Sequence, residues 1–312
     1  MKRSHVEVLI VGAGPAGLSA AKAIHDSNKS SIRVIERESE AGGIPRHTFH
    51  TGYGLRDFHR LMSGPKYAAR YVREVESRGI EISTSTTAFD WVDDQTLAIT
   101  SPRGIEEVKA DRIVLATGAR ERGRHARQIP GTRPAGIYTT GLLQQSVFIN
   151  HEKIGTRAVI VGAEHVSYSA IMTLRHAGVK IAAMVTPLVN HETFGVVNLA
   201  ATTIYRFPLI RNASITEIFG REQVSGVQVL QNDSNKLKES FIECDVLVFT
   251  ADWIPDNELV RLRDIEINPQ TKSPVVDSRG ETRLAGVYAI GNLVLPIKSA
   301  DQCAVQARAL FS

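Results

Sequence analysis

The chain has 312 residues, of which 43% are hydrophobic and 22% charged, and its formal net charge is +4. This balance is typical of a folded protein long enough for two domains, and it excludes a disordered chain. The sequence has no dense block of Lys and Arg, so we expect no nucleic-acid partner. It also has no run of 18 or more apolar residues, so we expect no membrane span and a cytoplasmic location.

The chain begins with a pattern that predicts a strand–helix–strand unit. Residues 6–11 are apolar and read as a strand, residues 14–25 or so read as a helix, and residues 32–36 read as a second strand. Such a unit implies parallel strands, because a helix carries the chain back to the start of the sheet.

The loop between the first strand and the helix fits the pattern GxGxxG with Gly12, Gly14 and Gly17. Gly12 allows a tight turn, Gly14 lets the backbone approach a pyrophosphate, and Gly17 lets helix and strand pack closely. The N-terminus of the helix then presents N–H groups to the phosphates. Glu36 ends the next strand, where a carboxylate can accept hydrogen bonds from ribose hydroxyls. Together these features favour a dinucleotide site over a purely structural glycine turn.

Two segments that follow have different expectations. Arg56, Asp57, His59 and Arg60 have helical spacing, so we expect them mostly to face solvent and to serve an interface more than catalysis. Residues 80–88, 91–100 and 104–110 alternate in the manner of antiparallel strands. Residues 112–116 form a buried strand that ends in Ala116-Thr117-Gly118.

The second half repeats this order. Residues 157–161, 164–176 and 179–185 read as strand, helix and strand. Residues 214–219, 223–230 and 236–243 then alternate in the manner of antiparallel strands, and residues 245–250 form an apolar strand. A last strand at 286–291 and a helix at 299–310 are expected to return to the first domain. We therefore predict an α/β fold with two Rossmann-like domains, each with a parallel sheet and a small antiparallel β meander. The expected boundaries are 1–121 with 249–312 for the first domain and 122–248 for the inserted second domain.

Three features favour FAD over NAD at the first loop. Ala41-Gly42-Gly43 lets the chain pass alongside an extended cofactor, and Gly118 closes a turn on the other side. Gly291-Asn292 can approach a ribityl chain. The helix that starts near Ser299 can direct its N–H groups at the electron-rich edge of the flavin.

These residues resemble the two-dinucleotide-domain flavoproteins of the thioredoxin-reductase-like class over nearly the whole chain. A closer resemblance is to the flavin-binding subunit of dye-linked amino-acid, opine and proline dehydrogenases and of hydrogen cyanide synthase. It is carried by GGIPRH (42–47), LRDFHRLMSGPKYA (55–68), GAEHVSYSA (162–170), TADWIPDNEL (250–259) and GNLVLPIKSAD (291–301).

We assign FAD binding to residues in these motifs and in the first unit, and His47 is a candidate to tune the flavin potential or relay a proton, with a surface position as the alternative. The expected FAD-binding residues are Gly12, Gly14, Pro15, Ala16, Glu36, Arg37, Gly43, Ile44, Arg46, Ala88, Ala116, Thr117, Gly118, Gly291, Asn292, Ser299 and Ala300.

The second loop keeps only Gly162, because Glu164 stands where Gly14 stands in the first loop. Two unit charges about 4 Å apart repel by roughly 4 kcal/mol at an effective dielectric near 20, so an ionised Glu164 opposes a pyrophosphate. The second site comprises Gly162, Glu164, His165 and Thr186, and Thr186 offers neither an acid for ribose nor an arginine for a 2′-phosphate. Three alternatives remain: a domain kept for packing or for a partner, another nucleotide as the proline dehydrogenase resemblance implies, or NAD(P)H bound with Glu164 turned away.

Few other residues suggest chemistry. The only cysteines, Cys244 and Cys303, are far apart and form no CxxC pair, so we expect both to be reduced, buried and inert. A thioredoxin reductase proper is therefore disfavoured. No metal is expected, because no zinc-binding spacing is formed by His151, His165, His176 and His191.

The leading hypothesis is an FAD-dependent oxidoreductase that transfers electrons as a subunit of an amino-acid, opine or amine dehydrogenase or oxidase, with a dehydrogenase subunit as partner. The alternatives are a self-sufficient NAD(P)H-dependent flavin or ferredoxin reductase and a non-redox nucleotide-binding module. A homo-oligomer is left open. The resemblance to flavin subunits of the hydrogen cyanide synthase type also implies a cysteine-rich C-terminal region that this sequence does not contain, so any iron–sulfur relay is expected on another subunit or is absent.

Overall fold

The computed structural model describes residues 2–188, 207–233, 236–296 and 298–312. These residues form two compact units. Unit 1 comprises Met1–Arg120 and Trp253–Ser312, and unit 2 comprises Glu121–Asp252. His191, and Ile297 of the last quoted motif, lie outside the described residues. No helix among the described residues is long and apolar enough to span a membrane.

Unit 1 is built on a seven-stranded sheet with the order β5-β2-β1-β8-β7-β6, in which β19 also pairs with β8. Neighbouring strands pair parallel along β5-β2-β1-β8 and between β8 and β19. Strand β6 pairs antiparallel with β7, and β7 pairs antiparallel with the first half of β8. The bounds are β1 Lys2–Val11, β2 Ile32–Ile35, β5 Glu81–Ser83, β6 Thr87–Asp93, β7 Thr96–Ser101, β8 Gly104–Leu115 and β19 Val287–Ala289.

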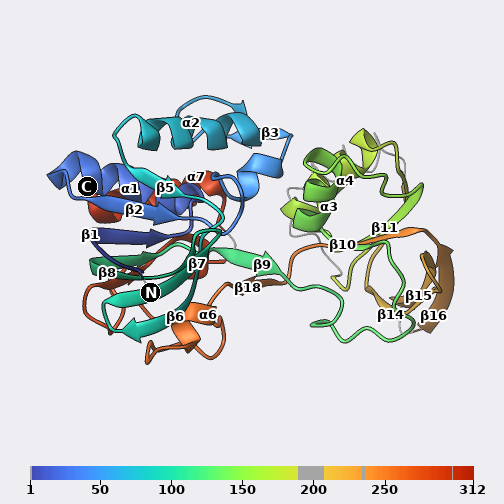
Figure 1. The fold of residues 1–312 in the computed structure, drawn as a ribbon. Coiled ribbons are helices and arrows are strands. Elements are labelled where there is room, and N and C mark those ends of the chain that lie inside the picture. Colours follow the sequence, from blue (N-terminus) through green and yellow to red (C-terminus); the bar gives the residue numbers. More distant parts are fainter. Residues whose placement is uncertain (1, 189–206, 234–235, 297) are drawn as a thin grey trace. The chain divides into compact units, whose positions relative to one another are not determined.

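The two faces of this sheet bury different partners. On one face, Val8, Ile10 and Val34 pack against helices α1, α2 and α7, which lie together in Figure 1. On the other face, Leu9 and Leu115 pack with residues of β6, β7 and α6. This alternation follows from the two-residue period of a strand. The helices are α1 Pro15–Asn28, α2 Gly64–Glu76, α6 Glu258–Arg261 and α7 Ala300–Phe311.

Short elements connect these parts of unit 1. The 3-10 helices are η1 Ile44–His47 and η2 Gly291–Leu293, and β3 Thr51–Tyr53 pairs with β4 Met62–Ser63. A further two-stranded sheet is formed by β9 Ala119–Glu121 and β18 Trp253–Pro255, at the two points where the chain passes from one unit to the other.

Unit 2 has a five-stranded parallel sheet, β10-β17-β11-β12-β13, and a separate antiparallel sheet, β14-β15-β16. Helices α3 and α4 pack on the parallel sheet through a common apolar core. The bounds are β10 Ile137–Thr139, α3 Thr140–Phe148, β11 Arg157–Val161, α4 His165–His176, β12 Lys180–Val185, β13 Leu209–Ile210, β14 Ala213–Gly220, β15 Val224–Asp233, β16 Lys236–Glu243 and β17 Val246–Phe249.

The predicted fold class is confirmed, because each unit has a parallel sheet and an antiparallel β meander. The units also share hydrogen bonds at equivalent places. Gly12 N–H donates to Ile35 O at 2.8 Å, and Gly162 N–H donates to Val185 O at the same distance. The duplication seen in the sequence therefore extends to the backbone of both loops.

Candidate functional site

The first glycine loop joins β1 to α1 at the carboxyl edge of the parallel strands of unit 1, where ligands of such sheets bind. Gly14 is the N-cap of α1 and Pro15 is its first residue. The first intrahelical bond runs from Leu18 N–H to Gly14 O, so the N–H groups of Ala16 and Gly17 have no acceptor within the helix. This end of α1 can therefore receive an anion.

Glycine stands at three positions of this loop for different physical reasons. A Cβ on Gly12, where φ is +108°, would collide with the carbonyl oxygen of Ala116, and a Cβ on Gly17 would collide with that of Gly12. A Cβ on Gly14 would meet no protein atom within 4 Å. Gly12 and Gly17 are thus required by the packing of the protein, whereas Gly14 leaves open space at the helix end. The expected role of this space, to receive a pyrophosphate, stays a prediction.

Glu36 closes the loop from the end of β2. Its side chain is buried, Oε2 accepts from Ala13 N–H at 2.9 Å, and Oε1 accepts from Glu38 N–H at 3.0 Å. Each carboxylate oxygen keeps a lone pair after one such bond. Glu36 fixes the loop through these two bonds, and its expected role in binding ribose hydroxyls stays a prediction. Ala88 lies near the start of β6, two residues after Thr86, whose N–H donates to Glu36 O.

The segment after Glu36 crosses the glycine loop. Gly42 N–H donates to Ala13 O at 2.9 Å, and Gly43, with φ at +61°, lies so close that a Cβ there would be 2.9 Å from Gly14 Cα. Arg46 follows in η1 and pairs with Glu40 and Glu38 at 3.2 and 3.7 Å. Its Nε is buried and has no hydrogen-bond partner. This Nε–H group is therefore a donor that an anionic ligand beside the loop could use.

Ile44 and His47 begin and end η1. The side chain of Ile44 is exposed, but His47 is only 4% exposed, so the alternative of a surface histidine is wrong. Its expected role near the flavin ring stays a prediction.

The turn after β8 is held by a residue that the sequence analysis did not assign to the site, Asp256. Thr117 Oγ1 donates to Asp256 O at 2.7 Å, and Asp256 N–H donates to Gly118 O at 2.9 Å. The Asp256 carboxylate accepts from Arg37 at 2.9 Å and Arg120 at 3.0 Å. Burial raises the pKa of Asp256 to about 6, with a further contribution from Glu258. Its position in the quoted segment TADWIPDNEL was the available signal.

The residues after β19 contact the first turn of α1 and lead into α7. A Cβ on Gly291, with φ at +67°, would lie 2.7 Å from the Cβ of Ala16, so this glycine permits close contact with the first turn of α1. The Asn292 side chain bonds both backbone groups of Lys298 at 3.0 Å, which fixes the entry to α7. Ser299 is the N-cap of α7, where it forms a capping box with Gln302, and Ala300 is the first residue of the helix.

The segment at residues 54–60 forms a turn instead of a helix. Arg56, His59 and Arg60 are exposed as expected, but Asp57 is buried. Its carboxylate accepts from the hydroxyls of Tyr67 and Tyr71 at 3.0 and 2.5 Å and from Arg308 at 2.8 Å. Hydrogen bonds to these partners hold Asp57 in a buried position that helical spacing does not predict. A second carboxylate, Asp301, accepts from the N–H groups of Gly54 and Arg56 and ties the turn to α7.

The second loop has the same backbone but a different interior. Glu164 is the N-cap of α4, and its Oε2 accepts from the hydroxyls of Ser167 at 3.1 Å and Thr250 at 3.2 Å. A Cβ on Gly162 would lie 2.7 Å from this oxygen. The carboxylate is thus turned back into the loop, and a side chain stands where Gly14 leaves space in the first loop.

The other two residues of the second site differ in exposure. Thr186 follows β12 as Glu36 follows β2, but it is 1% exposed and its hydroxyl accepts from Leu188 N–H at 3.3 Å. His165, the first residue of α4, is exposed. The acid that anchors the first loop therefore has no carboxylate counterpart after β12.

The prediction of buried, unpaired cysteines is confirmed. Cys244 lies in unit 2 and Cys303 in unit 1, and both are free and buried. Burial raises the pKa of Cys244 to about 12 and that of Cys303 to about 11. Both thiols therefore stay protonated at neutral pH and are poor nucleophiles.

Comparison with known proteins places these features in a family. The pyridine nucleotide-disulphide oxidoreductase family matches residues 6–307. An NADH dehydrogenase of Ferdinandcohnia aciditolerans is 27% identical over 92% of this chain and 52% of its own length. An alkyl hydroperoxide reductase subunit of Pseudomonas aeruginosa is 27% identical over 93% of this chain and 54% of its own length. The chain thus spans about half the length of these curated relatives.

Two shorter matches are to subunits of oxidases. The alpha chain of sarcosine oxidase from Corynebacterium sp. is 27% identical over 56% of this chain and 19% of its own, and an opine oxidase subunit of Rhizobium meliloti is 27% identical over 44% and 29%. Among solved structures, T. acidophilum thioredoxin reductase has a TM-score of 0.79 at 20% identity, covering 98% of this chain and 97% of that one. The chain belongs to the pyridine nucleotide-disulphide oxidoreductase family.

Proposed function

We propose that this chain is the FAD-carrying electron-transfer subunit of an amino-acid, opine or amine dehydrogenase or oxidase, and that its redox partner is another protein subunit. The observation that carries the proposal is the difference between the two loops. Gly14 leaves open space at the end of α1, whereas the equivalent position at the end of α4 carries the side chain of Glu164, whose carboxylate is bonded to Thr250. The chain thus offers one favourable site for a pyrophosphate and one unfavourable site.

The residues of unit 1 supply what FAD requires. The N-terminus of α1 and Gly14 would receive the pyrophosphate, Glu36 would accept the ribose hydroxyls, and Arg46 would contribute positive charge. Bound FAD supplies two-electron chemistry, which matches the two electrons and two protons released when an amine is oxidised to an imine. The N-terminus of α7 would then place partial positive charge beside the ring system.

Two observations oppose an electron route within the chain. The name of the family includes a disulphide, but the two cysteines of this chain lie in different units and both are buried with raised pKa values. Glu164 and the buried Thr186 weaken the case for a pyridine nucleotide in unit 2. Electrons must therefore enter or leave through another molecule, and the matches to sarcosine oxidase and opine oxidase support an amine-oxidising partner.

The second candidate is an NAD(P)H-dependent flavin or ferredoxin reductase. It is favoured by the backbone of the second loop, where Gly162 N–H keeps its bond to Val185 O and α4 begins as α1 does. The relative named NADH dehydrogenase supports the same candidate. In this case Glu164 would have to leave its bonds to Ser167 and Thr250 or tolerate a phosphate beside it.

The test uses the FAD-loaded chain without any partner and a panel of proline, sarcosine and octopine, with a redox dye as acceptor. We expect the flavin absorbance to stay oxidised with each amine and dye reduction to remain at background, while dithionite reduces the flavin fully. Dye reduction by the isolated chain at the rate of a complete dehydrogenase would overturn the subunit proposal. A chain that binds no FAD on reconstitution would overturn it as well.

A further inference from the structure

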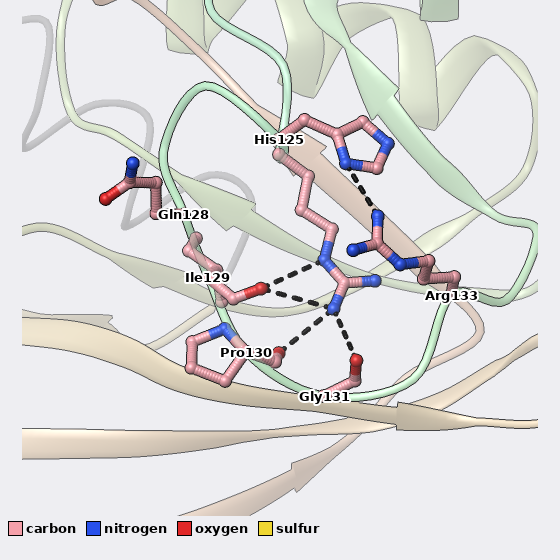
Figure 2. Close-up of a pocket in the computed structure, with 7 residues that line it drawn as sticks. His125, Gln128, Ile129, Pro130, Gly131 and Arg133 are labelled. Atoms are coloured by element: carbon pink, nitrogen blue, oxygen red, sulfur yellow. Dashed lines mark hydrogen bonds between the residues drawn. The ribbon is translucent and has the colours of Figure 1, made fainter.

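Segment 124–133 of unit 2 encloses a pocket that belongs to neither glycine loop. Its volume is about 310 Å³, and it is lined by the side chains of Arg124, His125, Gln128 and Arg133 and by the chain at residues 129–131. Figure 2 shows His125 and Arg133 pointing toward one another above this part of the chain. The lining contains three residues that carry or can acquire positive charge, and it contains no Asp or Glu.

Arg124 forms the base on which the segment folds. It is 8% exposed, and its guanidinium donates to the carbonyl oxygens of Ile129, Pro130, Gly131 and Thr132. Four carbonyl dipoles satisfy the hydrogen bonds of this cation but do not neutralise its charge. Burial and the neighbouring Arg133 lower the pKa of Arg124, and no carboxylate contributes in the opposite direction. The segment therefore folds around a buried positive charge.

Arg133 and His125 bring the remaining donors to the pocket. Arg133 Nη1 lies 2.8 Å from His125 Nδ1, and because arginine can only donate, Nδ1 must be the acceptor. The neutral imidazole then carries its proton on Nε2, which is a further donor. Both side chains are exposed, and the described residues place neither of them in an ion pair with a carboxylate. Arg122, by contrast, pairs with Asp252 in the same unit.

We propose that this pocket binds a phosphate group, either as inorganic phosphate or as the phosphate of a small phosphorylated metabolite. A phosphate oxygen accepts hydrogen bonds from guanidinium and imidazole N–H groups, and Arg133 and His125 bring both types to this pocket. The volume exceeds that of a single phosphate, so an esterified group also fits. The proposal concerns unit 2 alone and does not depend on the FAD site or on the partner subunit.

The test is isothermal titration of the full-length, FAD-loaded chain with inorganic phosphate and, in a second arm, with AMP. The informative variant is Arg133→Gln, because Arg133 is exposed and its removal leaves the bracing of the segment by Arg124 intact. The matched control is Arg221→Gln, which removes an exposed arginine of the same unit that lines no part of the pocket. Loss of one charge-assisted contact is expected to weaken binding about tenfold or more in Arg133→Gln and to leave the control unchanged.

The two arms distinguish the sources of the phosphate. Saturable binding of inorganic phosphate alone assigns the site to the free ion, and tighter binding of AMP assigns it to an esterified phosphate. The proposal is overturned when neither probe binds, when Arg133→Gln binds as tightly as the parent chain, or when Arg221→Gln loses as much affinity as Arg133→Gln. The last result would show a general effect of net charge.

Discussion

The carboxylate of Glu164 accepts a hydrogen bond from the hydroxyl of Thr250 at 3.2 Å, and Glu164 is the N-cap of α4 at the position where Gly14 leaves open space in the first loop. Both loops keep the same backbone bond to the neighbouring parallel strand. The two sites therefore share a backbone but differ in side chains, with Glu164 in place of Gly14 and Thr186 in place of Glu36. This difference underlies the proposed division of roles between the two units.

Replacement of Glu164 tests whether this side chain closes the second site. Glu164→Gly removes both the charge and the side chain, and Glu164→Gln removes only the charge. Because like charges repel strongly at an effective dielectric near 20, we expect Glu164→Gly to bind NADH or NADPH at least about tenfold more tightly than the parent chain. Fluorescence titration of the nucleotide measures this change.

The glutamine variant separates the two causes. If charge dominates, Glu164→Gln gains as much affinity as Glu164→Gly, and if space dominates, it gains little. An exposed acid of the same unit, Glu222, serves as control through Glu222→Gln, which should leave affinity unchanged. Equal affinities for all four proteins would contradict the proposed role of Glu164 in the second loop.

Gly14→Ala is expected to weaken FAD binding without unfolding the chain. A Cβ at this position meets no protein atom within 4 Å, so the apoprotein should lose no more than about 1 kcal/mol of unfolding free energy, the cost of alanine at an N-cap. The same Cβ occupies the space assigned to the pyrophosphate, so FAD affinity should fall at least about tenfold. Urea unfolding of the apoprotein and flavin titration measure the two effects separately.

Two other glycines provide the comparison. A Cβ on Gly123 also meets nothing within 4 Å, so Gly123→Ala should leave FAD affinity unchanged, whereas Gly17→Ala should destabilise the apoprotein through its collision with Gly12. A Gly14→Ala chain that retains parental FAD affinity would show that the pyrophosphate lies elsewhere.

Asp57→Ala is expected to destabilise unit 1 by about 3 kcal/mol or more, because it leaves Arg308 and the hydroxyls of Tyr67 and Tyr71 without their buried acceptor. The control is Asp264→Ala, which removes the acid of an exposed ion pair with Arg283 and should cost less than about 1 kcal/mol. Urea unfolding curves compare the variants. Similar losses for both would show that Asp57 is not an anchor.

Glu121 gives a prediction on pH. Burial raises the pKa of its carboxyl, although Gly141 N–H donates to Oε2 at 3.0 Å, and Oε1 is buried without a partner. The raised pKa means that the folded state holds the proton more tightly than the unfolded state. This contribution to stability is present below the unfolded pKa and is lost as the pH rises through the folded pKa.

Glu121→Gln removes this titration. Its thermal midpoint relative to the parent chain should therefore rise between pH 5 and pH 8, whereas Glu222→Gln should follow the parent chain at every pH. A constant difference between Glu121→Gln and the parent chain over this range would show that Glu121 ionises without cost.

Much of the fold is accessible from the sequence because apolar strands, glycine loops and amphipathic helices obey local rules. The strands predicted at residues 157–161 and 236–243 have the bounds of β11 and β16. Alternation predicts one strand over residues 91–100, but the chain turns between β6 and β7 near Asp94. The two strands predicted at residues 104–110 and 112–116 are one continuous strand, β8, which ends at Leu115. Alternation alone does not distinguish a hairpin from a continuous strand.

The site is less accessible where it depends on distant partners. Gly12, Gly14 and Glu36 follow a spacing that reports the loop directly. The roles of Asp256 and Asp57 depend on contacts with residues far along the chain, such as Arg37 and Arg308. No local pattern encodes such pairs, so helical spacing predicts that Asp57 faces solvent although it is buried.

The most direct test of the proposed division of roles is an anaerobic titration of the FAD-loaded chain with NADH and with NADPH, followed through the visible absorbance of the flavin. We predict that neither nucleotide reduces the flavin, while dithionite does so completely. Full bleaching at near-stoichiometric NADH or NADPH would contradict this prediction, because the second site would then deliver electrons to the flavin without a partner protein.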